Sequence, residues 1–299
     1  FRNNVKGKVP DTSSSNVKHD GKSGHWLEKQ FMIPANASNS ADILGYELKN
    51  ETSSKTTFGD WSANEFIFDD GNPFEETLEE YQTNYPLTIK CKTEKAQRKQ
   101  KRRHAFLEIF GSPNPKEGGR YSYSGRPIPK INTWNDFGQI LIIQDNLDIV
   151  ILYSYSQDKR NNKAQIVPIP MQKDEIILQR WYGKTSRSTK KKDKCLKDKL
   201  EDKFNQNGWF TCKTDSSGQY NQICFGKPID FATWINWVED GTVFFDCGMY
   251  QNNNRPYQQW RANNTQSKLN FQSIAYNLKK TVKSTFWLLT ITTQSANNR

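Results

Sequence analysis

The chain has 299 residues, enough for one large domain or two smaller ones with a buried core. Its 43 Lys and Arg exceed its 32 Asp and Glu, and the resulting net charge of +11 favours a polyanionic partner, nucleic acid or an acidic membrane surface. Aromatic residues make up 13% of the chain, which excludes a disordered basic tail. No apolar run approaches the roughly 20 residues that span a bilayer, so no membrane insertion is expected.

The five cysteines are odd in number and irregularly spaced, with no Cys-x-x-Cys pair and only three histidines in the chain. This pattern argues against a structural zinc site and against a secreted disulfide framework. We therefore expect reduced thiols and a cytoplasmic protein.

The N-terminal half begins with a polar arm over residues 1–20, followed by a helix over 23–31 that ends before Pro34. The acidic stretch 66–85 is typical of a solvated helix face, whereas the basic run 95–104 suits contact with phosphates. The strands predicted in this half cover residues 43–49, 56–61, 106–110, 139–144 and 148–155.

In the C-terminal half, a strand is expected over 175–182, and a basic segment over 184–203 ends in a helix. A second helix over 229–239 has Asp230 as its candidate cap. Further elements are a helix over 269–278 and strands over 242–246 and 286–292. The mixture predicts an α/β or α+β fold with a mixed central sheet flanked by helices.

One segment combines side chains suited to phosphodiester hydrolysis. In the sequence Ala-Asp-Ile-Leu-Gly-Tyr-Glu-Leu-Lys, Asp42 precedes a strand on which Glu47 and Lys49 share one face, and Gly45 permits a bend between them. Asp42, Glu47 and the Leu48 carbonyl offer three oxygens to Mg²⁺, which prefers such ligands, and Mn²⁺ is expected to substitute. The ion polarises the phosphate and activates a water, while Lys49 orients that water and offsets developing charge.

The preceding segment, Gly-Lys-Ser-Gly-His-Trp-Leu-Glu over residues 21–28, adds weight to this motif. Gly-x-x-Gly-x-x-Leu-Glu on a first helix, followed by Asp and then Glu-Leu-Lys, resembles the MutH-like branch of the PD-(D/E)XK nucleases. The resemblance covers residues 21–49, and Ala41 stands where the superfamily has Pro. It implies a two-lobed protein that grips duplex DNA in a cleft, with Asp42, Glu47 and Lys49 as catalytic residues and Glu28 supporting them from the helix.

Accordingly, residues 21–170 are predicted to form the catalytic lobe and residues 171–299 a DNA-recognition lobe. Phosphate and groove contacts are expected from Arg120, Tyr121, Arg126, Lys184 and Arg187, although a simple hairpin also explains residues 120–126. Base reading is expected from Arg255, Gln258, Gln259 and Arg261, because Arg pairs with guanine and Gln with adenine. A polar surface loop is the alternative for this last segment.

The sequence thus predicts a Mg²⁺-dependent type II restriction endonuclease of the prokaryotic cytoplasm. It would act as a monomer on double-stranded DNA and leave 5′-phosphate ends. A cognate DNA methyltransferase is expected in the same cell, but not as a stable complex. Two alternatives stay open: a nicking repair endonuclease that needs an activator, and a non-catalytic basic nucleic-acid-binding protein. His25 and His104 are weaker candidates for a general base, because a lone histidine is more often structural.

Overall fold

The computed structural model describes residues 1–13, 21–34, 38–50, 55–190 and 193–263. The helix expected over 269–278 and the strand over 286–292 lie outside these residues. The described α-helices are α1 (Lys22–Gln30), α2 (Glu75–Glu80), α3 (Glu94–Phe110), α4 (Lys163–Ile166), α5 (Leu196–Phe204) and α6 (Phe231–Glu239). Two short 3₁₀ helices cover Pro115–Glu117 and Ile169–Met171. None of the described helices has the length and apolar character that a membrane crossing requires.

The described strands form four small sheets rather than the single central sheet that we predicted. Their bounds are β1 (Tyr46–Asn50), β2 (Lys55–Gly59), β3 (Glu65–Phe66), β4 (Ser112–Asn114), β5 (Arg120–Tyr123), β6 (Phe137–Ile143), β7 (Ile149–Asp158), β8 (Ile176–Trp181), β9 (Gly208–Thr214), β10 (Tyr220–Gly226), β11 (Val243–Cys247), β12 (Met249–Tyr250) and β13 (Gln258–Asn263). The sheet orders are β1-β9-β10, β11-β13-β2, β12-β5-β4 and β3-β8-β7-β6, with β1 and β9 parallel and the other pairs antiparallel. The predicted mixed α/β class is confirmed.

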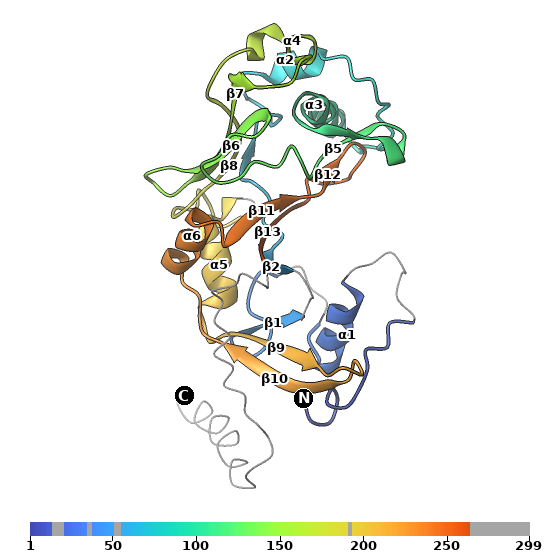
Figure 1. Cartoon of the computed structure of the whole chain (residues 1–299), viewed down its shortest axis with the longest axis vertical. Coiled ribbons are helices and arrows are strands. Elements are labelled where there is room, and N and C mark those ends of the chain that lie inside the picture. Colours follow the sequence, from blue (N-terminus) through green and yellow to red (C-terminus); the bar gives the residue numbers. More distant parts are fainter. Residues whose placement is uncertain (14–20, 35–37, 51–54, 191–192, 264–299) are drawn as a thin grey trace.

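Each of the four described sheets contains strands from both halves of the chain. β1 pairs with β9, β2 with β13, β3 with β8 and β5 with β12. A boundary at residue 170 therefore does not separate two independently folded lobes. Figure 1 shows instead three regions along the long axis: β1, β9, β10 and α1 at one end, the β11-β13-β2 sheet in the middle, and β6–β8 with α2 and α3 at the other end.

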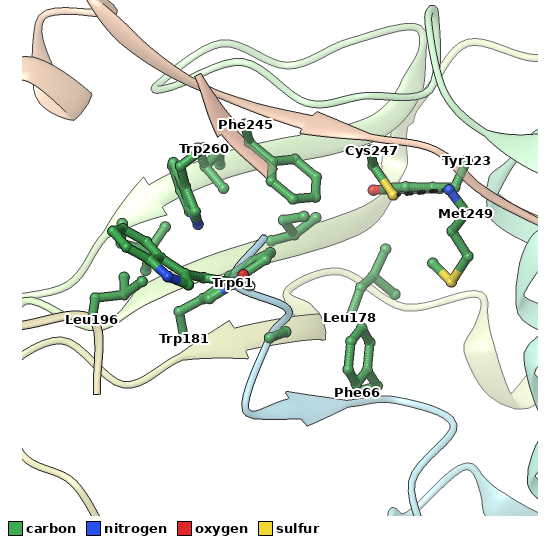
Figure 2. Packing of buried hydrophobic residues seen from close by; sticks show 14 of the residues in the cluster. Trp61, Phe66, Tyr123, Leu178, Trp181, Leu196, Phe245, Cys247, Met249 and Trp260 are labelled. Atoms are coloured by element: carbon green, nitrogen blue, oxygen red, sulfur yellow. Dashed lines mark hydrogen bonds between the residues drawn. The ribbon is translucent and has the colours of Figure 1, made fainter. Parts of the chain in front are cut away.

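The large core lies between the middle sheet and β8. Figure 2 shows Trp61, Trp181, Trp260 and Phe245 gathered there, and the Trp181 ring lies 5.6 Å from Trp260 and 5.1 Å from Phe245, both edge to face. All four rings are buried. Contacts of this kind contribute beyond simple area burial, so they fix the middle sheet against the upper one.

A smaller core lies at the end of the molecule formed by α1, β1, β9 and β10 (Figure 1). Leu27 of α1, Leu48 of β1 and Phe210 of β9 are buried in it. Val5 of the N-terminal arm is also buried there, and the Gly7 N–H donates to the Tyr220 carbonyl at 2.7 Å. The described part of the arm, residues 1–13, is thus fastened to β10.

The prediction of a strand over 106–110 was wrong, because α3 continues to Phe110. Residues 102 to 110 are all buried, so no helical alternation of apolar and polar residues remains to mark the segment. Thr93 caps the helix by accepting a hydrogen bond from the Ala96 N–H at 3.2 Å.

The acidic stretch is a solvated face only in part: Glu76 and Glu80 are exposed, whereas other carboxylates of the stretch form ion pairs within the fold. The Arg102 guanidinium is buried and forms ion pairs with Glu75 at 2.6 Å, with Glu79 at 2.5 Å and with Asp70. Lys99 pairs with Asp69 at 2.5 Å. Much of the basic run therefore neutralises neighbouring carboxylates within the fold, which reduces its value as a phosphate-binding surface.

Candidate active site

Asp42 is held beside β1 by a two-residue turn. Leu44 and Gly45 both have positive φ angles, 48° and 77°, as a type I′ turn requires, and Ile43 and Tyr46 form an antiparallel bridge across it. The Asp42 N–H donates to the Tyr46 carbonyl at 3.0 Å, and the Asp42 Oδ2 accepts from the Leu48 N–H at 2.8 Å. The bend expected at Gly45 is present.

The side chains of β1 alternate as predicted. Leu48 is buried in the small core, where α1 also places Leu27, whereas Glu47 and Lys49 form an ion pair at 2.9 Å. The Lys49 Nζ also donates to the Phe58 carbonyl of β2 at 3.4 Å and lies 5.1 Å from the centre of the Phe204 ring. Strand β1 thus presents one acidic and one basic side chain on the face opposite its core residue.

A second cation reaches Glu47 from a distant part of the sequence. The Lys203 Nζ, in the last turn of α5, lies 3.0 Å from the Glu47 Oε1, the same oxygen that Lys49 contacts. The Glu47 Oε2 is buried and has no hydrogen-bond partner in the part of the chain that the structure describes. The sequence analysis did not identify Lys203, because it lies in a lysine-rich segment in which nothing distinguishes one lysine from another.

The end of α5 also holds the turn that carries Asp42. The Asp202 carbonyl accepts from the Ala41 N–H at 3.1 Å, and Asn207 donates its backbone N–H to the Gly45 carbonyl at 2.9 Å and its Nδ2 to the Leu44 carbonyl at 2.7 Å. The site is therefore assembled from two segments, residues 39–50 and 199–207, that are far apart in sequence.

Burial shifts the protonation of two side chains in the site. It raises the pKa of Asp42 from 3.8 to about 6, and the nearby Glu47 carboxylate adds to this rise, while the hydrogen bond from the Leu48 N–H opposes it. Burial also lowers the pKa of Lys49, and the Glu47 carboxylate counteracts that effect. Both shifts arise where two carboxylates and two ammonium groups meet out of bulk water.

The arrangement suits an ion with oxygen ligands. Among the described residues, the buried carboxylate oxygen Oε2 of Glu47 has no hydrogen-bond partner, and the Glu47 carboxylate is close enough to Asp42 to raise the pKa of Asp42 by repulsion. The Leu48 N–H points toward Asp42, and the N–H and C=O of one strand residue lie on the same edge, so the Leu48 carbonyl faces the same side. Within the described ranges no group of three or more His, Cys, Asp or Glu could hold a metal. An ion here would therefore need the backbone carbonyl and waters, which Mg²⁺ accepts.

Glu28 lies on α1, which packs on the Leu48 side of β1. Leu27 is buried there, and Gly24 faces Asn50, whose Cβ would lie 3.6 Å from an added side chain. Glu28 itself is half-buried. Its supporting role in catalysis remains a prediction.

His25 is exposed, and His104 is buried with its Nε2 accepting from the Asn252 N–H at 2.9 Å. Burial, and then the neighbouring Arg103, lower the pKa of His104 to about 4. His104 thus has a structural role in joining α3 to the segment after β12.

The segment predicted to read bases is mostly strand β13, not a loop. Its alternation buries Gln258, Trp260 and Ala262. The Gln258 Oε1 accepts from the Ala63 N–H at 2.7 Å and its Nε2 donates to Gln179. The expectation that Gln258 contacts DNA was therefore wrong, and the alternating apolar residues Trp260 and Ala262 were the signal that would have identified the strand.

The neighbours of Gln258 lie on the other face of β13. Arg261 donates to Asp246 at 2.8 Å, and Gln259 donates to the Tyr257 hydroxyl at 2.5 Å. Arg255 is largely exposed and forms an ion pair with Asp60 at 2.5 Å. These three side chains, on or beside one face of the middle sheet, remain candidates for contact with bases.

The other predicted DNA contacts lie in two separate places. Arg120 stacks on Tyr250 at 3.9 Å from the ring centre, and Tyr121 is half-buried against the large core. Arg126 is exposed, 3.6 Å from Asp136. Lys184 is exposed, and Arg187 pairs with Glu65 at 2.7 Å while it covers the Tyr182 ring.

The turn-held aspartate, the Glu-x-Lys pair on β1 and the mixed α/β fold are the features that we predicted for a restriction-type nuclease. Comparison with known proteins specifies the family. Residues 5–271 match the model of the LlaMI restriction endonuclease family. The chain is 56% identical over 266 residues to the type II restriction enzyme ScrFI of Lactococcus lactis subsp. cremoris, which covers 89% of this chain and 92% of that protein. It is also similar, with a TM-score of 0.46 and 12% identity, to restriction endonuclease MvaI in complex with its cognate DNA substrate, over 86% of this chain and 88% of that one.

The chain belongs to the LlaMI restriction endonuclease family. The prediction of a type II restriction endonuclease is confirmed by this family and by the relative that is 56% identical over 266 residues.

Proposed function

We propose that the chain hydrolyses double-stranded DNA at a short specific site with Mg²⁺ held by Asp42, Glu47 and the Leu48 carbonyl. The observation that carries this proposal is the buried, unpartnered Glu47 Oε2 beside Asp42. An acidic oxygen left without a partner in the protein is costly, and a divalent cation supplies what it lacks.

The ion, when bound, polarises the scissile phosphate and lowers the pKa of a nearby water. Lys49 is placed to orient that water and to offset the charge that builds on the phosphate. Its anchorage by Glu47 and by the Phe58 carbonyl limits its motion. The water oxygen forms a bond to phosphorus as the bond from phosphorus to the 3′-oxygen breaks, which leaves a 5′-phosphate and a 3′-hydroxyl.

Recognition is assigned to the solvent-facing side of the middle sheet. Arg261 and Gln259 are donors that suit base edges, and Arg255 extends the same surface. Exposed cations such as Lys184 and Arg126 are assigned to phosphates, because a point charge contributes affinity without reading sequence. Mn²⁺ is expected to replace Mg²⁺. We further propose that the enzyme acts as a monomer on its site, with a methyltransferase that protects the same site in the cell.

The test is cleavage of supercoiled plasmid by the wild type, Asp42→Asn and Glu47→Gln, with duplex binding measured in parallel. Both variants should lose cleavage by several orders of magnitude and keep DNA binding, because they remove metal ligands without adding repulsion toward phosphate. Wild-type rates in either variant would refute the assignment, and full activity in excess chelator would refute a metal mechanism.

The same assay separates the two alternatives. Linear product from both strands without any added protein excludes a nicking enzyme that needs an activator. Binding without any divalent-ion-dependent cleavage, on DNAs rich in different short sites, would favour a non-catalytic binding protein. Mapping of the cut ends then gives the site and the position of the 5′-phosphates.

A further inference from the structure

Two ammonium groups approach one oxygen of Glu47, while its other oxygen has no hydrogen-bond partner within the described ranges. Lys49 reaches Oε1 along β1 at 2.9 Å, and Lys203 reaches it from α5 at 3.0 Å. All of these side chains are largely shielded from water, with 17% of Lys49, 19% of Lys203 and 4% of Glu47 exposed. The charges of Asp42 and Glu47 balance the two ammonium groups, yet both ammonium groups contact the same Glu47 oxygen, and this shared contact requires an explanation.

The Lys203 ammonium is not needed to pair with the carboxylates of its own helix turn. Its neighbours in the last turn have their own partners: Asp202 pairs with Lys194 at 2.8 Å, and Glu201 accepts from the Phe231 N–H at 3.3 Å. Lys203 instead points at the ligand carboxylate, from the same helix end whose Asp202 carbonyl and following Asn207 fix the Asp42 turn. The position of this ammonium is thus tied to the position of both proposed metal ligands.

A divalent ion held by Asp42 and Glu47 would lie within a few ångströms of this ammonium. Like charges at such distances repel strongly where solvent is excluded, so the ion and the Lys203 ammonium compete for Glu47. Lys49 has further contacts, with the Phe58 carbonyl and the Phe204 ring, that hold it in place, whereas the Glu47 oxygen is the contact found for the Lys203 ammonium in the described part of the chain.

We propose that Lys203 is a positioning residue that holds the Glu47 carboxylate in the metal-free enzyme and weakens the binding of the metal ion by competing for that carboxylate. The proposal rests on the proposed function, since it assumes that the ion binds at Asp42 and Glu47. Lys203 would keep the site ordered without metal and would set the concentration of ion that the enzyme needs.

The test uses Mn²⁺ binding to the purified chain without DNA, followed by the electron paramagnetic resonance signal of the free ion. Lys203→Met removes the charge and keeps an apolar stem of similar length, and it should bind Mn²⁺ about tenfold more tightly than the wild type. Lys203→Arg restores the charge and should return the affinity to near the wild-type value. Lys197→Met removes an exposed charge from the same helix and serves as the matched control, with unchanged affinity.

Equal or weaker Mn²⁺ binding by Lys203→Met would overturn the proposal. If that variant unfolds at the assay temperature, Lys203→Gln, which retains a hydrogen-bond donor for Glu47, takes its place with the same expected direction. Asp42→Asn and Glu47→Gln separate the two levels of the argument. If they leave Mn²⁺ binding intact, the metal site itself is wrong. If they abolish it while the Lys203 variants match the wild type, only the competition is wrong.

Discussion

The carboxylate of Asp42 accepts a hydrogen bond from the backbone N–H of Leu48 at 2.8 Å, across the turn that joins them. This bond uses the open edge of β1, because the other edge pairs with β9. Asp42 is thereby brought to the same strand edge as the Leu48 carbonyl and next to Glu47. The proposed metal ligands are thus preorganised by backbone geometry before any ion arrives.

Asp42→Asn should stabilise the metal-free protein at neutral pH. Burial and then Glu47 raise the pKa of Asp42 to about 6 in the folded state, from 3.8. The folded chain therefore binds the Asp42 proton more tightly than the unfolded chain does. The stabilisation of the folded wild type by this proton is complete below about pH 4 and is lost as pH rises through 6. Above pH 7, the free energy of unfolding of Asp42→Asn should exceed that of the wild type by about 1 kcal/mol, after allowance for solvent screening.

Urea unfolding in chelator at pH 4, 6 and 8 measures this difference. The free energy of unfolding of the variant minus that of the wild type should grow with pH and level off above pH 7. A difference that does not change across this range would show that Asp42 titrates normally.

Lys49→Met should abolish the chemical step, whereas Glu28→Gln should slow it less. Lys49 touches Glu47 within the site, while Glu28 lies on the helix that packs behind Leu48. Single-turnover cleavage with saturating enzyme measures the chemical step directly, and duplex binding in chelator should be retained by both variants. A Glu28 variant slower than the Lys49 variant would reverse the two roles.

Gly45→Ala should impair cleavage more than its effect on stability explains. Gly45 has φ 77°, and a Cβ there would lie 2.8 Å from the Asn207 Nδ2, so the change disturbs the turn that carries Asp42. The backbone conformation alone should cost about 1 kcal/mol. Gly71→Ala is the matched control, since Gly71 has φ 76° and open space around it. Thermal unfolding and cleavage measured together should show similar stability losses but a cleavage defect only at Gly45.

Arg261→Ala should lower affinity for the cognate site by about 1–3 kcal/mol and affect random DNA little, because its guanidinium is assigned to a base. Lys184→Ala should weaken both duplexes alike and reduce the salt dependence of binding by about one unit. Binding of each variant across a salt series in chelator provides the comparison. Equal losses on both DNAs for Arg261→Ala would make the β13 face a phosphate-binding surface only.

Gln258→Ala should destabilise the fold by about 1–3 kcal/mol without changing the preference for the cognate site, because it leaves the Ala63 N–H and the Gln179 amide without partners. Chemical denaturation and the ratio of cognate to random binding check the two parts. A changed ratio of cognate to random binding in a stably folded variant would indicate that Gln258 contacts DNA after all.

The parts of the site that depend on near neighbours in the chain could be predicted from the amino-acid sequence. The helix α1, the turn at Gly45 and the alternation of Glu47, Leu48 and Lys49 follow from spacing and local conformation over fewer than thirty residues. These local rules also carried the resemblance to nucleases, which the family match then confirmed.

The distant groups that complete the site, and the predicted groups that are buried, became clear only from the three-dimensional packing of the chain. Lys203 reaches Glu47, and Asn207 reaches the turn that carries Asp42, because β9, directly after them, pairs in parallel with β1. No local sequence pattern predicts a contact between residues so far apart. The end of α3 is buried on every side, so its sequence shows no helical pattern, and the register of β13 turns Gln258 toward the core. The periodicity of apolar residues identifies only an element that has one solvent-exposed face and one buried face. Elements that are buried on both faces, and contacts between distant parts of the chain, depend on tertiary packing.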